Sequence, residues 1–152
     1  MSYARARTIS VGMSQSLWAV PRDPSPFSAW IKRLAAETGG PVFAPHITLA
    51  GDVPPTEPFT VDLLGLADSD ARFRCITITA ARTPPLDVID DPHLSLLYGD
   101  LPAERRAELR AAITLPLPTT IVVNEVWRVD TSGDVRNWSI EQTWPLVATS
   151  RG

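Results

Sequence analysis

Apolar and polar residues alternate along several segments of the chain, and this pattern predicts short strands. Residues i and i+2 of a strand face the same side, so a strand with one buried face is apolar at every second position. β-branched and aromatic residues, which favour strands, gather in the same segments. The predicted strands cover residues 16–20, 43–50, 73–80, 93–98, 119–129 and 138–146.

Other segments have the spacing of helices. One is predicted to begin at Ser25, as the capping residue with Pro26 in the first turn, and to end at the glycine pair 39–40. Its apolar stripe comprises Phe27, Trp30, Ile31 and Leu34. A second helix is predicted over 103–113, after Pro102. The segment 57–67 is ambiguous, and a short helix around 61–66 is favoured.

Strands and helices mix without regular βαβ alternation, which predicts the α+β class. The length of 152 residues fits one domain. Residues 1–13 are polar and without periodicity, so we expect a flexible extension followed by a single domain over 14–152.

Composition narrows the function classes. The formal net charge of −3 argues against a general nucleic-acid binder, which would be strongly basic. Cys75 is the only cysteine, so neither an intrachain disulfide nor a cysteine-based zinc site is expected. No signal-peptide core and no run of roughly 20 apolar residues occurs. We therefore expect a soluble, cytoplasmic protein, monomeric and without a membrane segment.

Two segments of the chain repeat one pattern. Residues 45–49 read Pro-His-Ile-Thr-Leu and are followed by Gly-Asp-Val at 51–53. Residues 92–96 read Pro-His-Leu-Ser-Leu and are followed, after one extra residue, by Gly-Asp-Leu at 99–101. The repeat indicates a duplicated half-domain, with the two copies placed symmetrically about a cleft.

The repeat brings paired polar groups to one face of each strand. His46 and Thr48 project together, as do His93 and Ser95, while the intervening residues point into a core. If the two strands lie side by side, two imidazoles and two hydroxyls converge. This set suits cleavage of a cyclic phosphodiester without a metal or cofactor. One imidazole takes a proton from water, the other gives one to the departing ribose oxygen, and the hydroxyls donate to the phosphate oxygens.

Two alternatives for the histidines carry less weight. A single histidine is most often a half-buried side chain with its hydrogen bonds satisfied, but two matched copies are hard to explain that way. A zinc site with two histidines would need carboxylates as well, and the hydroxyls two residues later would then have no purpose.

The paired H-x-T and H-x-S motifs resemble those of the two-histidine (2H) phosphoesterases. The stretch PHLSLLYGDL at 92–101 is similar to the cyclic phosphodiesterase branch known from plants and yeast, and SLWAVP at 16–21 is similar to its opening strand. The resemblance covers roughly residues 14–146. It departs at Ser95, where many members have threonine, which also supplies a hydroxyl.

The resemblance implies a bilobal fold in which two antiparallel sheets face a central cleft, with helices outside. It implies hydrolysis of nucleoside 2',3'-cyclic phosphates or of ADP-ribose 1'',2''-cyclic phosphate. Its catalytic residues correspond to His46, Thr48, His93 and Ser95, and Tyr98 corresponds to a residue of the cleft.

Two aromatic residues are further candidates for substrate binding. Tyr98 lies an odd number of residues from Ser95, so an unbroken strand would point it away, whereas a bulge before Gly99 would turn it back. Trp18 is a candidate for stacking on a base, with a place in the core as the alternative. Phe43 and Trp127 are expected in the core or at the rim.

The sequence thus predicts a hydrolase acting on a small cyclic nucleotide or a short RNA end. Alternatives with the same fold act on RNA termini, 2',5'-linked oligonucleotides or cyclic oligonucleotides. A module that binds a cyclic nucleotide without cleaving it is a further alternative. Which histidine is the acid, and whether the product is a 2'- or a 3'-phosphate, stays open.

Overall fold

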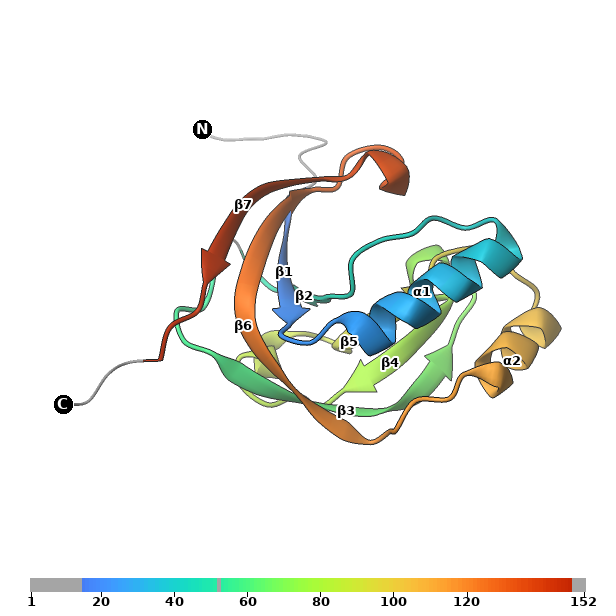
Figure 1. The fold of residues 1–152 in the computed structure, drawn as a ribbon, viewed down its shortest axis with the longest axis horizontal. Coiled ribbons are helices and arrows are strands. Elements are labelled where there is room, and N and C mark those ends of the chain that lie inside the picture. Colours follow the sequence, from blue (N-terminus) through green and yellow to red (C-terminus); the bar gives the residue numbers. More distant parts are fainter. Residues whose placement is uncertain (1–14, 52, 149–152) are drawn as a thin grey trace.

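A computed structural model describes residues 15–51 and 53–148 (Figure 1). The predicted extension over 1–13 and Asp52 of the first repeat lie outside the described residues. The main elements are β1 (Gln15–Pro21), α1 (Ser25–Thr38), β2 (Ile47–Leu49), β3 (Phe59–Asp68), β4 (Ile76–Ala80), β5 (His93–Leu97), α2 (Ala103–Ala112), β6 (Thr119–Asp130) and β7 (Ser139–Pro145). Three short 3₁₀ helices are η1 (Arg72–Arg74), η2 (Leu86–Val88) and η3 (Val135–Asn137).

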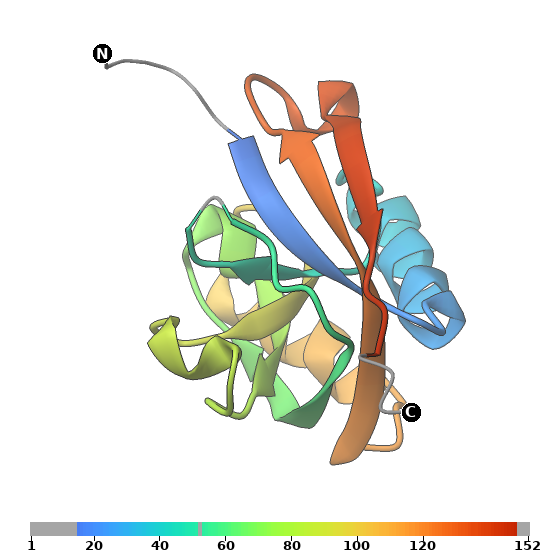
Figure 2. The ribbon, with the colours of Figure 1, turned by 90° about the vertical axis from the view of Figure 1, so that its left-hand side faces the viewer.

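The described strands form one antiparallel sheet in the order β1-β2-β5-β4-β3-β6-β7. β1 also pairs with β6, so six strands close into a ring and β7 lies outside it on the edge of β6. Figure 2 shows β1, β6 and β7 side by side. The α+β class is confirmed, but the two separate sheets predicted are wrong. Closure pairs strand edges that two open sheets would leave exposed.

The long strand β6 explains why the sheet is continuous. Its first residues pair with β3, from Thr119 opposite Leu63 to Val123 opposite Phe59. Its later residues pair with β1 on one edge and with β7 on the other. One strand of 12 residues therefore takes part in both halves of the ring.

Helix α1 follows the predicted apolar stripe. Its buried residues are Phe27, Ile31, Leu34 and Ala35. Gly39 ends the helix in the left-handed conformation with φ 75°, as predicted. The predicted capping role of Ser25 is wrong, because Pro24 is the capping residue and the Ser25 hydroxyl instead donates to Asp23 at 2.7 Å.

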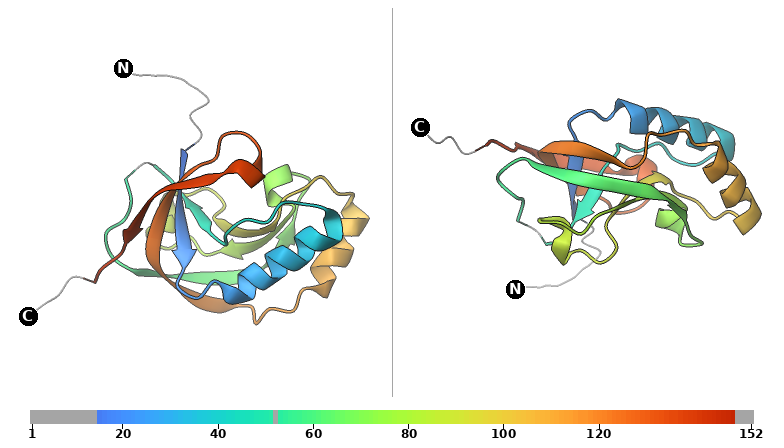
Figure 3. Two further views of the ribbon diagram at one scale, coloured as in Figure 1. Left: turned by 45° about the horizontal axis from the view of Figure 1, so that its top comes forward. Right: turned by 90° about the horizontal axis from the view of Figure 1, so that it is seen from below.

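The two helices lie at the periphery of the molecule, α1 packed on β5 and α2 on β3 (Figure 3). Helix α2 matches the prediction to within a residue. Neither of these helices has the length and apolar character needed to cross a membrane.

The segment over 59–68 is a strand, so the helix favoured around 61–66 is wrong. Val61 and Leu63 are fully buried while Thr60 and Asp62 are exposed, which is the alternation of a half-buried strand. Pairing with β4 on one edge and β6 on the other outweighs the weak local preference for helix.

Two predicted strands are shorter than expected. The strand predicted over 43–50 is regular only at Ile47–Leu49, because Pro45 lacks the N–H group that a sheet ladder requires. The first residues of the strand predicted over 73–80 belong to η1, and regular pairing begins at Ile76. Both irregular segments lie beside the cavity described below.

Most of the apolar core is enclosed between the ring and α1. On β2 and β5 the predicted core residues Ile47, Leu49, Leu94 and Leu96 are all buried. Cys75 is fully buried in the same core, as expected for inert packing. The opposite face of these two strands is therefore left to the polar residues of the repeats.

Candidate active site

The two repeats lie on neighbouring strands, β2 and β5, which run antiparallel with Ile47 opposite Leu94 (Figure 1). Since both of these residues point into the core, their neighbours in sequence point to the other face. The antiparallel direction places Thr48 near His93 and His46 near Ser95. The pairing predicted from the repeat is therefore present, with the two copies running in opposite directions.

A cavity of about 410 Å³ opens on this face. Its size is in the range usual for small-molecule sites. It is lined by all six residues singled out from the sequence, namely Trp18, His46, Thr48, His93, Ser95 and Tyr98. The other lining residues are Ser16, Phe73, Arg74, Thr131, Gly133 and Trp138.

His46 is held on two sides. Its Nδ1 lies 2.7 Å from the carbonyl oxygen of Ala44, and because a carbonyl only accepts, the ring nitrogen donates. Its ring is stacked on Trp18 with centroids 3.5 Å apart and planes 4° from parallel. The neutral ring therefore carries its proton on Nδ1, and Nε2 keeps a lone pair.

His93 is oriented by the equivalent bond. Its Nδ1 donates to the carbonyl oxygen of Asp91, two residues upstream, at 3.0 Å. Asp91 has φ 59°, the left-handed conformation, which aspartate adopts more readily than most residues. The histidines differ in burial, because His93 is half-buried whereas only 4% of the His46 surface is exposed.

Burial decides the protonation of His46. Loss of hydration is the largest effect, and it lowers the pKa of His46 from 6.5 to about 4. The hydrogen bond to Ala44 favours the charged form and raises the pKa, whereas the charge of His93 lowers it a little further. His46 is therefore a neutral imidazole at pH 7, with its basic nitrogen unprotonated.

This shift predicts an acid-sensitive fold. The unfolded chain binds a proton at His46 below about pH 6.5 but the folded chain does so only near pH 4, so stability falls as the pH falls through this window. A pKa lowered from 6.5 to about 4 corresponds to about 3 kcal/mol of unfolding free energy. The difference in unfolding free energy between pH 7.0 and pH 4.5 is measured by urea denaturation. The His46→Asn variant should lose less stability on acidification, and an equal loss would contradict the assignment.

The two hydroxyls of the repeats differ in their surroundings. Ser95 is buried, and its Oγ donates to the carbonyl oxygen of Phe73 at 3.0 Å. Thr48 is exposed at the cavity. The similar sequences of the two copies thus give one hydroxyl engaged with the backbone and one facing solvent.

The predicted bulge before Gly99 is present in β5. Ile76 pairs with Leu97 but Thr77 pairs with Ser95, so β5 has one extra residue at this step. Tyr98 consequently lines the same cavity as Ser95 and forms a side-chain hydrogen bond with it. Burial raises the pKa of the Tyr98 phenol well above its ordinary value, so the hydroxyl stays protonated.

Trp18 lies at the wall of the cavity with its ring stacked on His46. Only 4% of its surface is exposed, and Trp127 lies on β6 directly opposite it in the sheet, with ring centroids 6.5 Å apart. Most of the ring is therefore covered by its neighbours. We propose that Trp18 positions His46 instead of stacking on substrate.

Six of the lining residues were not identified from the sequence, and three of them have large side chains that can contact a ligand. Phe73 lies on η1 and is 50% exposed, Trp138 follows η3 and is half-buried, and Arg74 ends η1. Phe73 and Trp138 have ring centroids 6.1 Å apart, and each contacts Tyr98 edge to face, at 5.1 and 6.0 Å. No motif links these segments in sequence, and an exposed aromatic residue at a strand end was the only available signal.

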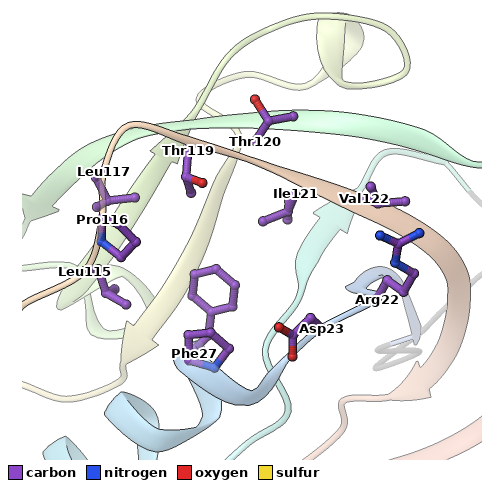
Figure 4. Close-up of a pocket in the computed structure, with 11 residues that line it drawn as sticks. Arg22, Asp23, Phe27, Leu115, Pro116, Leu117, Thr119, Thr120, Ile121 and Val122 are labelled. Carbon is purple, nitrogen blue, oxygen red and sulfur yellow. The ribbon is translucent and has the colours of Figure 1, made fainter.

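Other cavities in the described part of the chain have different linings. One of about 240 Å³ lies between the start of α1 and residues 115–122, with Arg22 and Asp23 beside Phe27 and Leu117 (Figure 4). It contains neither of the histidines. Across residues 15–51 and 53–148, no group of three or more His, Cys, Asp or Glu side chains is arranged to hold a metal ion.

Comparisons with known proteins give the fold. No family model matches the chain, and a search of curated proteins finds no match. The structure of Escherichia coli LigT with phosphate is 21% identical and aligns with a TM-score of 0.50 over 90% of this chain and 98% of LigT. LigT with ATP and a structure described as a phosphoesterase both align at a TM-score of 0.48 and 21% identity. They cover 88% and 89% of this chain, and 99% and 100% of theirs.

The chain therefore has the fold of Escherichia coli LigT.

Proposed function

We propose that this protein is a 2H phosphoesterase that hydrolyses cyclic phosphodiesters of nucleotides, with His46 as general base and His93 as general acid. One observation carries the proposal. Two imidazoles face one cavity, and each is held through Nδ1 by the carbonyl oxygen two residues upstream, which leaves both Nε2 atoms for proton transfer. A purely structural histidine has no need of an oriented partner.

The base role follows from the environment of His46. A general base must be unprotonated when water attacks, and burial against Trp18 keeps His46 neutral well below pH 7. Nε2 of His46 takes a proton from the attacking water as the water oxygen bonds to phosphorus. The stacked ring and the bond to Ala44 keep that nitrogen in one orientation.

The acid role falls to His93. Its ring is half-buried at the cavity, and the bond from Nδ1 to the Asp91 carbonyl leaves Nε2 for the departing oxygen. When the bond from phosphorus to one ribose oxygen breaks, Nε2 of His93 gives that oxygen its proton. The product is a nucleoside monophosphate, and proton transfer from His46 back to His93 through solvent restores the starting state.

Thr48 and Ser95 are proposed to donate to the non-bridging phosphate oxygens, where charge grows in the transition state. Thr48 can do so from its exposed position. Ser95 can do so once its hydroxyl leaves the Phe73 carbonyl, with Tyr98 as its neighbour. The two donors then approach the phosphate from the two strands.

The aromatic cluster Phe73–Tyr98–Trp138 favours a nucleotide over a smaller phosphodiester. A half-exposed phenylalanine beside a half-buried tryptophan in the cavity lining is unfavourable in water and offers flat faces to a nucleobase. The similar fold of LigT, which was crystallised with phosphate, is consistent with a phosphate-containing ligand.

Turnover of a substrate panel tests the proposal. The panel contains nucleoside 2',3'-cyclic monophosphates, ADP-ribose 1'',2''-cyclic phosphate, a 2',5'-linked dinucleotide, a cyclic dinucleotide and a short RNA with a cyclic phosphate end, each assayed in EDTA. We expect the mononucleotide cyclic phosphates to be hydrolysed. Turnover of only the other members would move the function to their class, and tight binding without turnover of any would identify a binding module.

Removing the aromatic cluster should weaken binding of a base and leave the chemistry intact. Phe73→Ala and Trp138→Ala each remove a stacking face worth about 1–3 kcal/mol, so the KM for a 2',3'-cyclic nucleotide should rise about 5- to 150-fold with little change in kcat. Ribose 2',3'-cyclic phosphate, which lacks a base, should be hydrolysed equally by wild type and variants. An equal loss on both substrates would contradict base stacking.

A further inference from the structure

Arg74 is the only residue with a fixed charge among the described residues that line the cavity. A cyclic phosphodiester carries one negative charge, and a site that excludes water must offset it. His46 is neutral and the hydroxyls supply only dipoles. The Arg74 guanidinium is therefore the one permanent cation available to this anion.

The segment that carries Arg74 is fixed to the catalytic strand. The carbonyl of Phe73 accepts the Ser95 hydroxyl at 3.0 Å, and the carbonyl of Arg72 accepts the N–H of Gly99 at 2.9 Å. The backbone of η1 is thereby held at two adjacent residues against β5 and its bulge. Arg74 follows directly, so its side chain starts from a defined place at the cavity.

Asp91 links Arg74 to His93. Nη1 of Arg74 lies 2.5 Å from Oδ2 of Asp91, while the backbone carbonyl of Asp91 accepts Nδ1 of His93. Both partners of the ion pair are substantially exposed, at 43% and 60%, and such pairs contribute little stability. A guanidinium has five N–H donors, so the bond to Asp91 leaves others for a second acceptor.

We propose that Arg74 binds a non-bridging oxygen of the phosphodiester and that Asp91 orients it for this contact. The inference rests on the proposed function of the cavity and names the cation that the reaction uses. In this arrangement, one guanidinium edge stays on Asp91 and the other faces the phosphate. Asp91 then positions both the cation, through its carboxylate, and His93, through its carbonyl.

The test compares two neighbouring arginines. Arg74→Met and Arg72→Met change the net charge equally, and Arg72 is an exposed residue of the same 3₁₀ helix that does not line this cavity. We expect Arg74→Met to lower kcat/KM about 10- to 100-fold, the usual effect of losing a hydrogen bond to a charged group. Arg72→Met should stay within about 3-fold. Equal losses in the two variants would overturn the proposal.

Two further variants separate contact with substrate from support of the loop. Arg74→Lys keeps the charge and should recover part of the lost activity. Asp91→Asn keeps the backbone carbonyl and a side chain that tolerates the left-handed conformation, so it should cost no more than about 5-fold. If Asp91→Asn is as damaging as Arg74→Met and the double variant is no worse, Arg74 acts only through the loop and the proposal is wrong.

Calorimetric binding of adenosine 2'- and 3'-monophosphate keeps this inference distinct from the proposed function. Wild type should bind them about 10- to 100-fold more tightly than Arg74→Met, whereas Arg72→Met should bind like wild type. If no cyclic phosphate is hydrolysed but this difference in binding is found, the proposed function fails and the role of Arg74 stands. If cyclic phosphates are hydrolysed but Arg74→Met matches wild type in both binding and turnover, the proposed role of Arg74 is wrong and the proposed function stands.

Discussion

Replacing either His46 or His93 with asparagine is expected to lower kcat/KM for a 2',3'-cyclic nucleotide by about 10²- to 10⁴-fold. Each imidazole moves one proton in the same step. When one imidazole is removed, water must accept or donate that proton in its place. The asparagine amide is a suitable replacement, because its N–H can still donate to the carbonyl of Ala44 or of Asp91 while it carries no titratable proton. The loss should therefore reflect chemistry more than structure.

The double variant should be about as inactive as the more damaged single variant, since groups that act as a unit are not additive. Binding of adenosine 3'-monophosphate and the thermal unfolding midpoint at pH 7 serve as controls for an intact cavity. A single variant that keeps its fold and more than a tenth of wild-type kcat/KM would remove that histidine from the mechanism.

The second large effect is expected at Trp18, where stability and protonation are linked. Replacing a buried tryptophan with alanine costs about 3–5 kcal/mol of unfolding free energy. The same change uncovers the ring of His46, because Trp18 is stacked on it at 3.5 Å. With water at that ring, the pKa of His46 should move from about 4 up toward 6.5.

The kinetic consequence has a definite direction. His46 must be neutral to act as base, so the acid limb of the kcat/KM profile lies near pH 4 in wild type and moves upward in Trp18→Ala. A pH–rate profile and an NMR titration of the imidazole protons measure the shift. Trp18→Phe, which keeps a flat ring, should leave the limb close to its wild-type position.

Trp144→Ala is a control that removes a half-buried tryptophan on β7, away from the cavity lining. It should reduce stability without moving the acid limb. If the limb moves equally in Trp144→Ala and Trp18→Ala, then general loosening of the fold controls His46, and stacking does not.

Local regularities made part of this molecule predictable. Side chains alternate along any strand, so His46 with Thr48, and His93 with Ser95, had to share faces, whatever the fold. The extra residue before Gly99 suggested a bulge, and β5 contains one at this step. Helix α1 could be placed because its apolar stripe and its terminal glycine are read from neighbouring residues.

Pairing between distant segments determined what local patterns left open. The residues 61–66 have a weak preference of their own, and two flanking strands decide that they form β3. The single closed sheet depends on β1 meeting β6 more than a hundred residues later. No alternation of residues encodes that closure.

The different environments of the two histidines are the clearest example of a feature that local sequence patterns could not predict. Two nearly identical repeats predict two equivalent histidines, and sequence by itself determined their presence, their shared face and their hydroxyl partners. Only the tertiary structure decided that Trp18 buries His46 while His93 stays half-exposed, and that Phe73, Arg74 and Trp138 join them. The physical reason is that hydration and charge at a side chain depend on what packs against it, and those neighbours come from remote parts of the chain.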